Sequence, residues 1–363
     1  MSGFNTFLLQ LFAVPFFSAA QEGGMVTDYL KLSSGCTAAA AAALPASVSA
    51  LRAAAVAQYR HDGYYVARGL LSAQEVALVK QALEQDPSLK TNMIELGDEQ
   101  GGATRFSLWS NPGNGTLGAL TRSSRVVQSM RLLLGGEVLH YHSKSLTKHP
   151  KAGGAWTWHQ DYGYWYKVST LVLLLLLLRL PVSLSLLRIQ DFFLLPDLST
   201  AYFAIDRQTP QNGAFTVLKG SHALGRIDHG TIGDQQGADL ERVELAKARY
   251  EELVLELDPG DCVFFDALLL HTSKGNFSPS RRMAFASVFT RADNIQWKKP
   301  YIPCWKVDEV SDGLLLEKGV AIESAVQKVM LGSEEGKAAG AKRKDGSYEE
   351  ALDSIEKKLE TKE

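Results

Sequence analysis

Cysteine is scarce in this chain of 363 residues, which contains only Cys36, Cys262 and Cys304. Their number is odd, their spacing is wide, and no Cys-x-x-Cys pair is present. These features argue against a disulfide framework and against a structural zinc site. They are typical of a reducing compartment, so we expect an intracellular protein, most simply a cytoplasmic one.

An excess of charge of either sign is also lacking. The chain has 38 Lys and Arg residues against 40 Asp and Glu residues, a net charge of -2. Nucleic-acid binding requires a strongly basic surface, so we expect no nucleic-acid partner. Hydrophobic residues make up 45% of the chain, which is enough for a proper core, and the length suits one large domain with extensions or two modest domains.

No apolar run has the properties of a membrane span. The stretch 4–20 ends in small residues, as a signal peptide does, but no Lys or Arg precedes it. Residues 1–24 are therefore either an organellar or secretory leader or a mis-called start, with Met25 as the true first residue. The stretch 171–187 is shorter than the ~20 apolar residues that a span needs, and an arginine and a proline interrupt it. We expect no stable membrane span.

The leucine-rich stretch has another explanation at the level of the gene. Leu, Ser, Pro and Phe have largely pyrimidine-rich codons, Val168 and Ser169 can be read from a splice-donor-like GTAAG, and Gln190 from an acceptor-like CAG. We therefore interpret residues 168–190 as a retained intron that is translated. Its removal would join GYWYK directly to DFFLLPDLST.

The composition changes along the chain and divides it into three parts after the first segment. Residues 25–56 are an alanine-rich lead-in, and a sequence with the composition of a folded domain begins at 57. This domain, 57–305, includes the leucine-rich insertion. Residues 306–363 are charged and repetitive, and we expect a helical surface tail without catalytic elements.

Local patterns in the domain predict helices first and strands later. The alternating run within 63–69 predicts a strand, and Ser72 with Glu75 forms a capping box that begins a helix. The run 125–134 predicts a second amphipathic helix, ended by Gly135. The rest of the domain has many short β-prone runs between turn residues. The chain therefore has the pattern of a mainly β fold with flanking helices (α+β), a β-sandwich or jelly roll.

The strongest chemical signal is the sequence Trp-Thr-Trp-His159-Gln-Asp161. Side chains alternate along a strand with a period of two, so a His-x-Asp pair on a strand projects an imidazole and a carboxylate from one face. These groups are two of the three ligands of a facial triad, which leaves open positions on iron(II) for a cosubstrate and oxygen. A lone His-x-Asp pair is weak evidence, because most such pairs are surface residues.

A third ligand and a site for a cosubstrate carboxylate follow later in the chain. His271 comes after the turn DPGD and the apolar run CVFFDALLL, which predicts a buried strand that a jelly roll can place beside the first pair. A guanidinium matches a carboxylate with two parallel hydrogen bonds, and Arg281 and Arg282 begin the next strand. One of them should point into the barrel, and the hydroxyl of Ser273 can bind the same carboxylate.

Taken in order, the segments HDGYYVARGLLSAQEV, HQDYGYW, PQNGAFTVLKGSH, DPGDCVFFDALLLHTS and SRRMAF resemble the phytanoyl-CoA dioxygenase family. The resemblance covers about 57–294, and the order and spacing of the motifs make it specific. It implies a double-stranded β-helix and a dioxygenase that uses iron(II), 2-oxoglutarate and O2. It also implies hydroxylation coupled to oxidative decarboxylation, which yields succinate and CO2.

The resemblance also assigns roles to residues. His159, Asp161 and His271 fall on the iron ligands, and we expect no catalytic side chain beyond the metal centre. Arg282 falls best on the arginine that binds the cosubstrate, because the family commonly places it eleven positions after the distal histidine. Arg281 is the alternative.

Three further positions fall near the cosubstrate in the family. Ser273 falls on a hydroxyl that contacts it, Tyr202 lies where some members have a tryptophan, and Lys144 lies near another contact on the strand before the His-x-Asp pair. His222 and His229 lie outside the motif positions, so we do not assign them as ligands.

The substrate stays open between a small molecule and an acyl-CoA thioester, with an aliphatic C–H bond as the target. Halogenating relatives replace the acidic ligand by a small residue, and the retained Asp161 favours hydroxylation. The alternative is a catalytically inactive jelly-roll binding protein, in which the leucine-rich insertion disrupts the active site. The aromatic residues around the His-x-Asp pair are either core packing or the wall of a substrate pocket.

Overall fold

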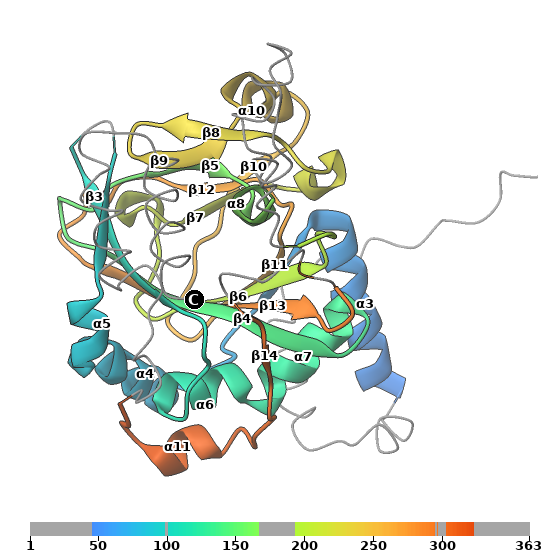
Figure 1. Ribbon diagram of the computed structural model, residues 1–363, viewed down its shortest axis with the longest axis vertical. Helices are drawn as coiled ribbons and strands as arrows, with labels where there is room; N and C mark the ends of the chain where they lie inside the picture. The colour runs from blue at the N-terminus through green and yellow to red at the C-terminus, as the bar shows by residue number, and fades with distance from the viewer. Residues whose placement is uncertain (1–45, 99–100, 167–192, 295, 297–302, 323–363) are drawn as a thin grey trace, which may run out of the picture.

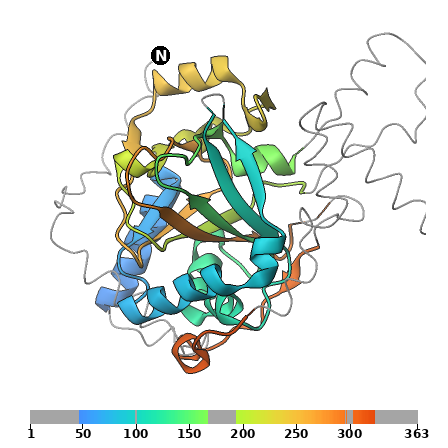
Figure 2. The same ribbon diagram turned by 90° about the vertical axis from the view of Figure 1, so that its left-hand side faces the viewer.

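The computed structural model describes residues 46–98, 101–166, 193–294, 296 and 303–322. Two antiparallel sheets face each other, and helices cover the outer face of the larger sheet (Figure 1, Figure 2). The strands are β1 Tyr64–Ala67, β2 Ile94–Gly97, β3 Ala103–Trp109, β4 Val138–Lys148, β5 Trp156–His159, β6 Leu198–Ala204, β7 Phe215–Leu218, β8 His229–Ile232, β9 Gln235–Ala238, β10 Glu252–Val254, β11 Cys262–Asp266, β12 His271–Ser273, β13 Arg282–Arg291 and β14 Trp305–Lys306. The helices are α3 Ala46–Asp62, α4 Ala73–Gln85, α5 Pro87–Thr91, α6 Thr116–Arg122, α7 Ser124–Leu134, α8 Asp161–Trp165, α10 Leu240–Lys247 and α11 Leu314–Lys318, with short 3-10 turns η1 Pro210–Asn212 and η2 Ser221–Leu224.

The larger sheet has the strand order β1-β11-β6-β13-β4-β3-β2, with β14 paired to β4, and the smaller sheet has the order β10-β7-β12-β5. A separate hairpin, β8-β9, and helix α10 lie over the smaller sheet (Figure 1). This arrangement is the jelly roll, or double-stranded β-helix, and it confirms the predicted fold class.

Strands β6 and β13, at the centre of the larger sheet, are buried on both faces. On β13, Phe285 and Phe289 pack in the core between the sheet and the helices, whereas Ala284 and Ala286 pack in the core between the two sheets. The period of two therefore sorts every second residue of β13 toward the space between the sheets. The same alternation places the site residues of β4, β6 and β13 in that space.

The predicted helix signals are confirmed. Ser72 and Glu75 form a complete capping box at the start of α4, and α7 ends at Gly135 in the left-handed conformation with φ 74°. The carboxylate of Glu75 also accepts hydrogen bonds from Arg125, so the cap of α4 is tied to α7. Helices α4, α6 and α7 thereby form one layer beneath the larger sheet (Figure 2).

Several predicted segments fall partly or wholly outside the described residues. The possible leader 1–24 and the proposed intron 168–190 lie outside them, as does most of the charged tail. In the described part of the tail, β14 pairs with β4, and Leu315 of α11 is buried in the core beneath the larger sheet. Among the described residues, no helix is both long and apolar enough to cross a membrane.

Candidate metal and cosubstrate site

The predicted ligands meet where two strands of the smaller sheet pair. His159 ends β5, His271 begins β12, and the two residues are direct antiparallel partners. Each is 4% exposed, and Asp161 is 1% exposed. The ring centroids of the two histidines lie 4.0 Å apart. Residues separated by more than a hundred positions in the chain thus share one buried site.

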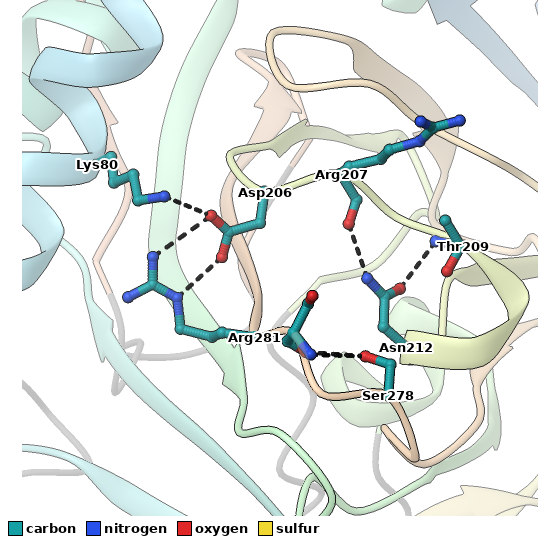
Figure 3. A pocket seen from close by; sticks show the side chains of 8 residues that line it. Lys80, Asp206, Arg207, Thr209, Asn212, Ser278 and Arg281 are labelled. Carbon is teal, nitrogen blue, oxygen red and sulfur yellow. Dashed lines mark hydrogen bonds and ion pairs between the residues drawn. The ribbon is translucent and has the colours of Figure 1, made fainter.

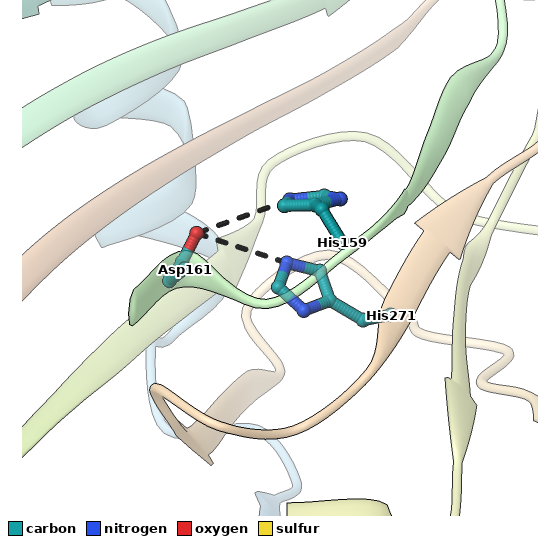
Figure 4. A group of neighbouring side chains, drawn as sticks. All are labelled: His159, Asp161 and His271. Atoms are coloured by element: carbon teal, nitrogen blue, oxygen red, sulfur yellow. Dashed lines mark ion pairs between the residues drawn. The ribbon is translucent and has the colours of Figure 1, made fainter. Parts of the chain in front are cut away.

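The three side chains converge on a common point (Figure 4). The Nε2 atom of His159 and the Nε2 atom of His271 each lie 3.9 Å from Oδ1 of Asp161. One potential ligand atom from each residue lies within 4.8 Å of the others. Two imidazole nitrogens and one carboxylate oxygen are the donor set of a facial triad, so these residues fit a divalent iron ion.

Backbone carbonyls fix which ring nitrogen of each histidine faces the site. Nδ1 of His159 donates to the carbonyl of Thr157 at 2.8 Å, and Nδ1 of His271 donates to the carbonyl of Leu269 at 2.9 Å. With the proton held on Nδ1, each Nε2 presents a lone pair to the common point. Hydrogen bonds of this kind orient metal-binding imidazoles in proteins.

The protonation states also suit a metal. Burial lowers the pKa of both imidazoles, and for His159 the neighbouring His271 lowers it further. Burial raises the pKa of Asp161, but the Lys144 ammonium 3.9 Å from Oδ1, together with His271 and the Thr200 hydroxyl, outweighs this effect and leaves the pKa below its ordinary value. Both imidazoles are therefore neutral and the carboxylate is charged, as metal binding requires.

One detail of the sequence prediction was wrong: Asp161 does not lie on a strand with His159. Strand β5 ends at His159, and Asp161 is the first residue of α8. The intervening Gln160 keeps an extended backbone, with φ -109° and ψ 137°, so the alternation continues for one more residue. The two side chains consequently share a face although the strand has ended.

The predicted cosubstrate residues line a cavity that also contains the two histidines. Arg282, Ser273, Tyr202 and Lys144 all contribute to its wall. Arg282 is 4% exposed, donates to the Tyr202 hydroxyl, and donates to Oε1 of Gln208 at 3.3 Å. Within the described part of the chain, Arg282 has no carboxylate partner. Because an unpaired buried charge is costly, this guanidinium is suited to an anionic ligand.

The neighbouring Arg281 does not line this cavity, and its side chain points toward Asp206 in another pocket (Figure 3). Its guanidinium donates to Asp206 at 2.9 Å and to Glu84 at 2.6 Å, so its charge is already neutralised by carboxylates. Arg281 and Asp206 line a separate pocket of about 560 Å³ together with Lys80. The structure therefore separates the two arginines that the sequence left as alternatives.

A second buried basic side chain lies beside Arg282, and it is not among the residues assigned from the sequence. Lys148 is 1% exposed, is the register partner of Arg282, and lines the same cavity. Its Nζ donates to the carbonyls of Ser273 at 3.2 Å and Lys274 at 2.6 Å. Burial, and then the charge of Arg282, lowers the pKa of Lys148. Lys144 and Lys148 are separated by an even number of positions on β4, so their side chains lie on the same face of the strand. This spacing is the feature of the sequence from which Lys148 could have been found.

The aromatic residues near the pair divide between wall and core. Trp156 lines the cavity, and the Tyr164 ring lies 5.3 Å from that of His159. Trp165 is buried against Tyr141 in a separate core cluster. Trp158 packs below helix α10, away from the histidines.

A jelly roll with a buried two-histidine, one-carboxylate site defines the class of non-haem iron oxygenases. Residues 59–284, more than half of the chain, match the phytanoyl-CoA dioxygenase (PhyH) family. The chain belongs to this family, and it is a 2-oxoglutarate-dependent dioxygenase with iron(II), 2-oxoglutarate and O2 as cofactors. The predicted family is therefore confirmed.

Individual relatives are more distant. The chain is similar to an ectoine dioxygenase of Stutzerimonas stutzeri, with 26% identity over 66% of this chain and 76% of that protein. It is also similar to an L-proline trans-4-hydroxylase of Streptomyces griseoviridis, with 25% identity over 68% of this chain and 90% of that protein. Among solved structures, EctD from S. alaskensis with bound Fe matches with a TM-score of 0.53 and 21% identity, over 70% of this chain and 86% of that one, and supports the fold.

Proposed function

We propose that this chain hydroxylates an aliphatic C–H bond of a small molecule, and that His159, Asp161 and His271 hold the iron. The observation that carries this proposal is the convergence of two Nε2 atoms, each 3.9 Å from one carboxylate oxygen, in a buried site. Hydrogen bonds from Nδ1 of both imidazoles to backbone carbonyls, and from the Thr200 hydroxyl to Oδ2 of Asp161, support it, since they fix the ligands in the orientation a metal needs.

The oxidising chemistry comes from the iron and the cosubstrate when bound: oxidative decarboxylation of 2-oxoglutarate to succinate and CO2 is coupled to hydroxylation. The protein supplies position and charge. We assign Arg282 to the distal carboxylate of 2-oxoglutarate, with the Tyr202 and Ser273 hydroxyls beside it in the same cavity. Lys148 fixes the backbone of Ser273, because its Nζ donates to the Ser273 carbonyl.

Lys144 has a different position from the other assigned cations. Its ammonium lies 3.9 Å from Oδ1 of Asp161, at the metal end of the cavity, whereas Arg282 lies against Tyr202. It can therefore bind the carboxylate of 2-oxoglutarate that lies nearer the metal, or hold Asp161 in its charged form. Both roles require the Lys144 ammonium to remain beside Asp161.

A small, amino-acid-like substrate is favoured over an acyl-CoA thioester. The relatives named above are ectoine and proline hydroxylating enzymes, and phytanoyl-CoA enters only through the name of the family. The alternative of an inactive binding protein is not favoured, because all three ligands are assembled and buried.

The test is succinate formation from 2-oxoglutarate with added iron(II), in the presence of a panel of cyclic amino acids and acyl-CoA thioesters. We expect the wild-type protein to form succinate and the His159→Ala variant to form none. The control is His149→Ala, because His149 is half-buried and contacts Arg105 rather than the metal ligands. Equal succinate formation by wild type and His159→Ala would contradict the proposal.

A further inference from the structure

The residue between the first two ligands is fully engaged by the surrounding backbone. Gln160 is 0% exposed. Its side-chain amide nitrogen donates to the carbonyls of Gly225 at 2.8 Å and Leu268 at 2.7 Å, and its amide oxygen accepts from the backbone N–H of Ile227 at 2.7 Å. One side chain thus joins the His-x-Asp segment to two other segments of the chain.

One of these segments carries the third ligand. Leu268 lies in the turn between β11 and β12, one residue before Leu269, whose carbonyl accepts from Nδ1 of His271. A second bond reinforces the link, because the backbone N–H of Tyr162 donates to the carbonyl of Ala267 at 2.9 Å. The turn before His271 is therefore tied to the residues on both sides of Asp161.

A histidine outside the metal site holds the backbone of the same residue. The N–H of Gln160 donates to Nε2 of His229 at 2.9 Å, and Nδ1 of His229 donates to the carbonyl of Ile227 at 2.9 Å. A Cβ atom added to Gly163 would lie 2.1 Å from the His229 ring, so only glycine leaves room for this ring beside α8. The hairpin β8-β9 thereby supports the ligand segment from outside.

We propose that Gln160 and His229 are positioning residues that set the separation of the three metal ligands and, through it, the affinity for the metal. The proposal rests on the metal site of the proposed function. His159 and Asp161 flank the held residue, and the turn that orients His271 is bound to its side chain. Because a metal site needs its ligands placed within a few tenths of an ångström, loss of these bonds should weaken metal binding selectively.

A purely structural role makes a different prediction. Any buried amide that bonds to three backbone groups contributes to stability, and its loss lowers stability wherever it lies. Asn276 provides the comparison: it is 1% exposed, its amide nitrogen donates to the carbonyls of Lys148 at 3.1 Å and Ser280 at 2.8 Å, and its oxygen accepts from the N–H of Ser278 at 3.0 Å. This residue has the same bonding pattern without a link to the ligands.

The experiment compares Gln160→Met, His229→Phe and the control Asn276→Leu in the full-length protein. Binding of Co(II) is followed by its visible absorption, and urea unfolding of the metal-free proteins is measured in parallel. We expect the Co(II) dissociation constant to rise by about 10- to 100-fold for Gln160→Met and His229→Phe. The control should lose stability to a similar extent as Gln160→Met and keep the wild-type dissociation constant and spectrum.

Wild-type metal affinity in Gln160→Met, or an equal loss of affinity in Asn276→Leu, would overturn the proposal. If Gln160→Met does not fold, His229→Phe and Gly163→Ala decide the question, since the added methyl group displaces the His229 ring. Unchanged affinity in both would overturn it equally. A His159→Ala variant distinguishes failure of the metal site from failure of the positioning roles. Co(II) binding that is insensitive to His159→Ala would refute the metal site itself.

Discussion

Replacing Arg282 by glutamine tests the cosubstrate site by removing the charge of the guanidinium. The guanidinium is 4% exposed and bonds to the neutral groups of Tyr202 and Gln208, so its charge is free to pair with an anion. A hydrogen bond to a charged group contributes roughly 1.5–3 kcal/mol. Its loss should raise the dissociation constant of 2-oxoglutarate by roughly 10- to 150-fold, since ~1.4 kcal/mol corresponds to tenfold.

The free energy of unfolding of the cosubstrate-free variant should not fall, although its affinity for 2-oxoglutarate does. In the cosubstrate-free protein, Arg282→Gln removes a buried charge that has no carboxylate partner among the described residues. An uncompensated buried charge is unfavourable, so its removal should leave the free energy of unfolding unchanged or higher. Saturating 2-oxoglutarate should therefore raise the melting temperature of the wild type and have little effect on the variant, because a ligand stabilises only the state that binds it.

The assay is calorimetric titration of 2-oxoglutarate into the Mn(II)-loaded protein, with thermal unfolding in parallel. Arg281→Gln is the matched control, since the adjacent arginine is paired with Asp206 and Glu84 outside the cavity. It should bind 2-oxoglutarate as the wild type does. Unchanged affinity in Arg282→Gln, or an equal loss in Arg281→Gln, would refute the assignment.

Three other predictions concern the insertion and the stability of the fold. Deletion of 168–190 should leave a folded protein with wild-type Co(II) affinity, because the Tyr162 hydroxyl donates at 3.1 Å to the carbonyls of both Phe193 and Leu194 and so joins the flanking segments; failure to fold would contradict this. Burial lowers the pKa of His140 from 6.5 to about 3 and that of His229 to about 4. Below pH 6.5 the unfolded chain therefore binds more protons than the folded chain, and the folded state loses stability. The urea concentration at the unfolding midpoint of the metal-free protein should be lower at pH 5 than at pH 7. Arg125→Met should reduce the free energy of unfolding by about 3–5 kcal/mol, because it leaves the buried Glu75 carboxylate without its partner, whereas Glu95→Gln at an exposed pair should cost under ~1 kcal/mol.

The fold could be predicted from the sequence, and so could the three candidate ligands that the structure brings together, because their signals are local. Short β-prone runs between turn residues predicted the strands, and His159, Asp161 and His271 each lie next to a recognisable turn or strand end. The choice between Arg281 and Arg282 was different. It depends on which face of β13 meets the space between the sheets, and this follows from the pairing of Arg282 with Lys148 on β4.

The supporting roles of Gln160 and His229 could not be predicted from local sequence patterns. Gln160 bonds to a carbonyl 108 positions away, and His229 bonds to a residue 69 positions away. Neither contact leaves a trace in composition or periodicity, because each depends on how distant segments pack together. Gln160 contacts the turn between β11 and β12, and His229 belongs to the hairpin β8-β9. The end of β5 before Asp161 was missed for a related reason: an extended residue outside a strand has the same alternation as one within it.

The most direct test of the central claim is a crystal structure of the protein with Mn(II) and 2-oxoglutarate. We expect the metal to be bound by Nε2 of His159, Nε2 of His271 and a carboxylate oxygen of Asp161, with the distal carboxylate of 2-oxoglutarate against Arg282. A metal bound elsewhere, or a cosubstrate carboxylate that avoids Arg282, would contradict the account.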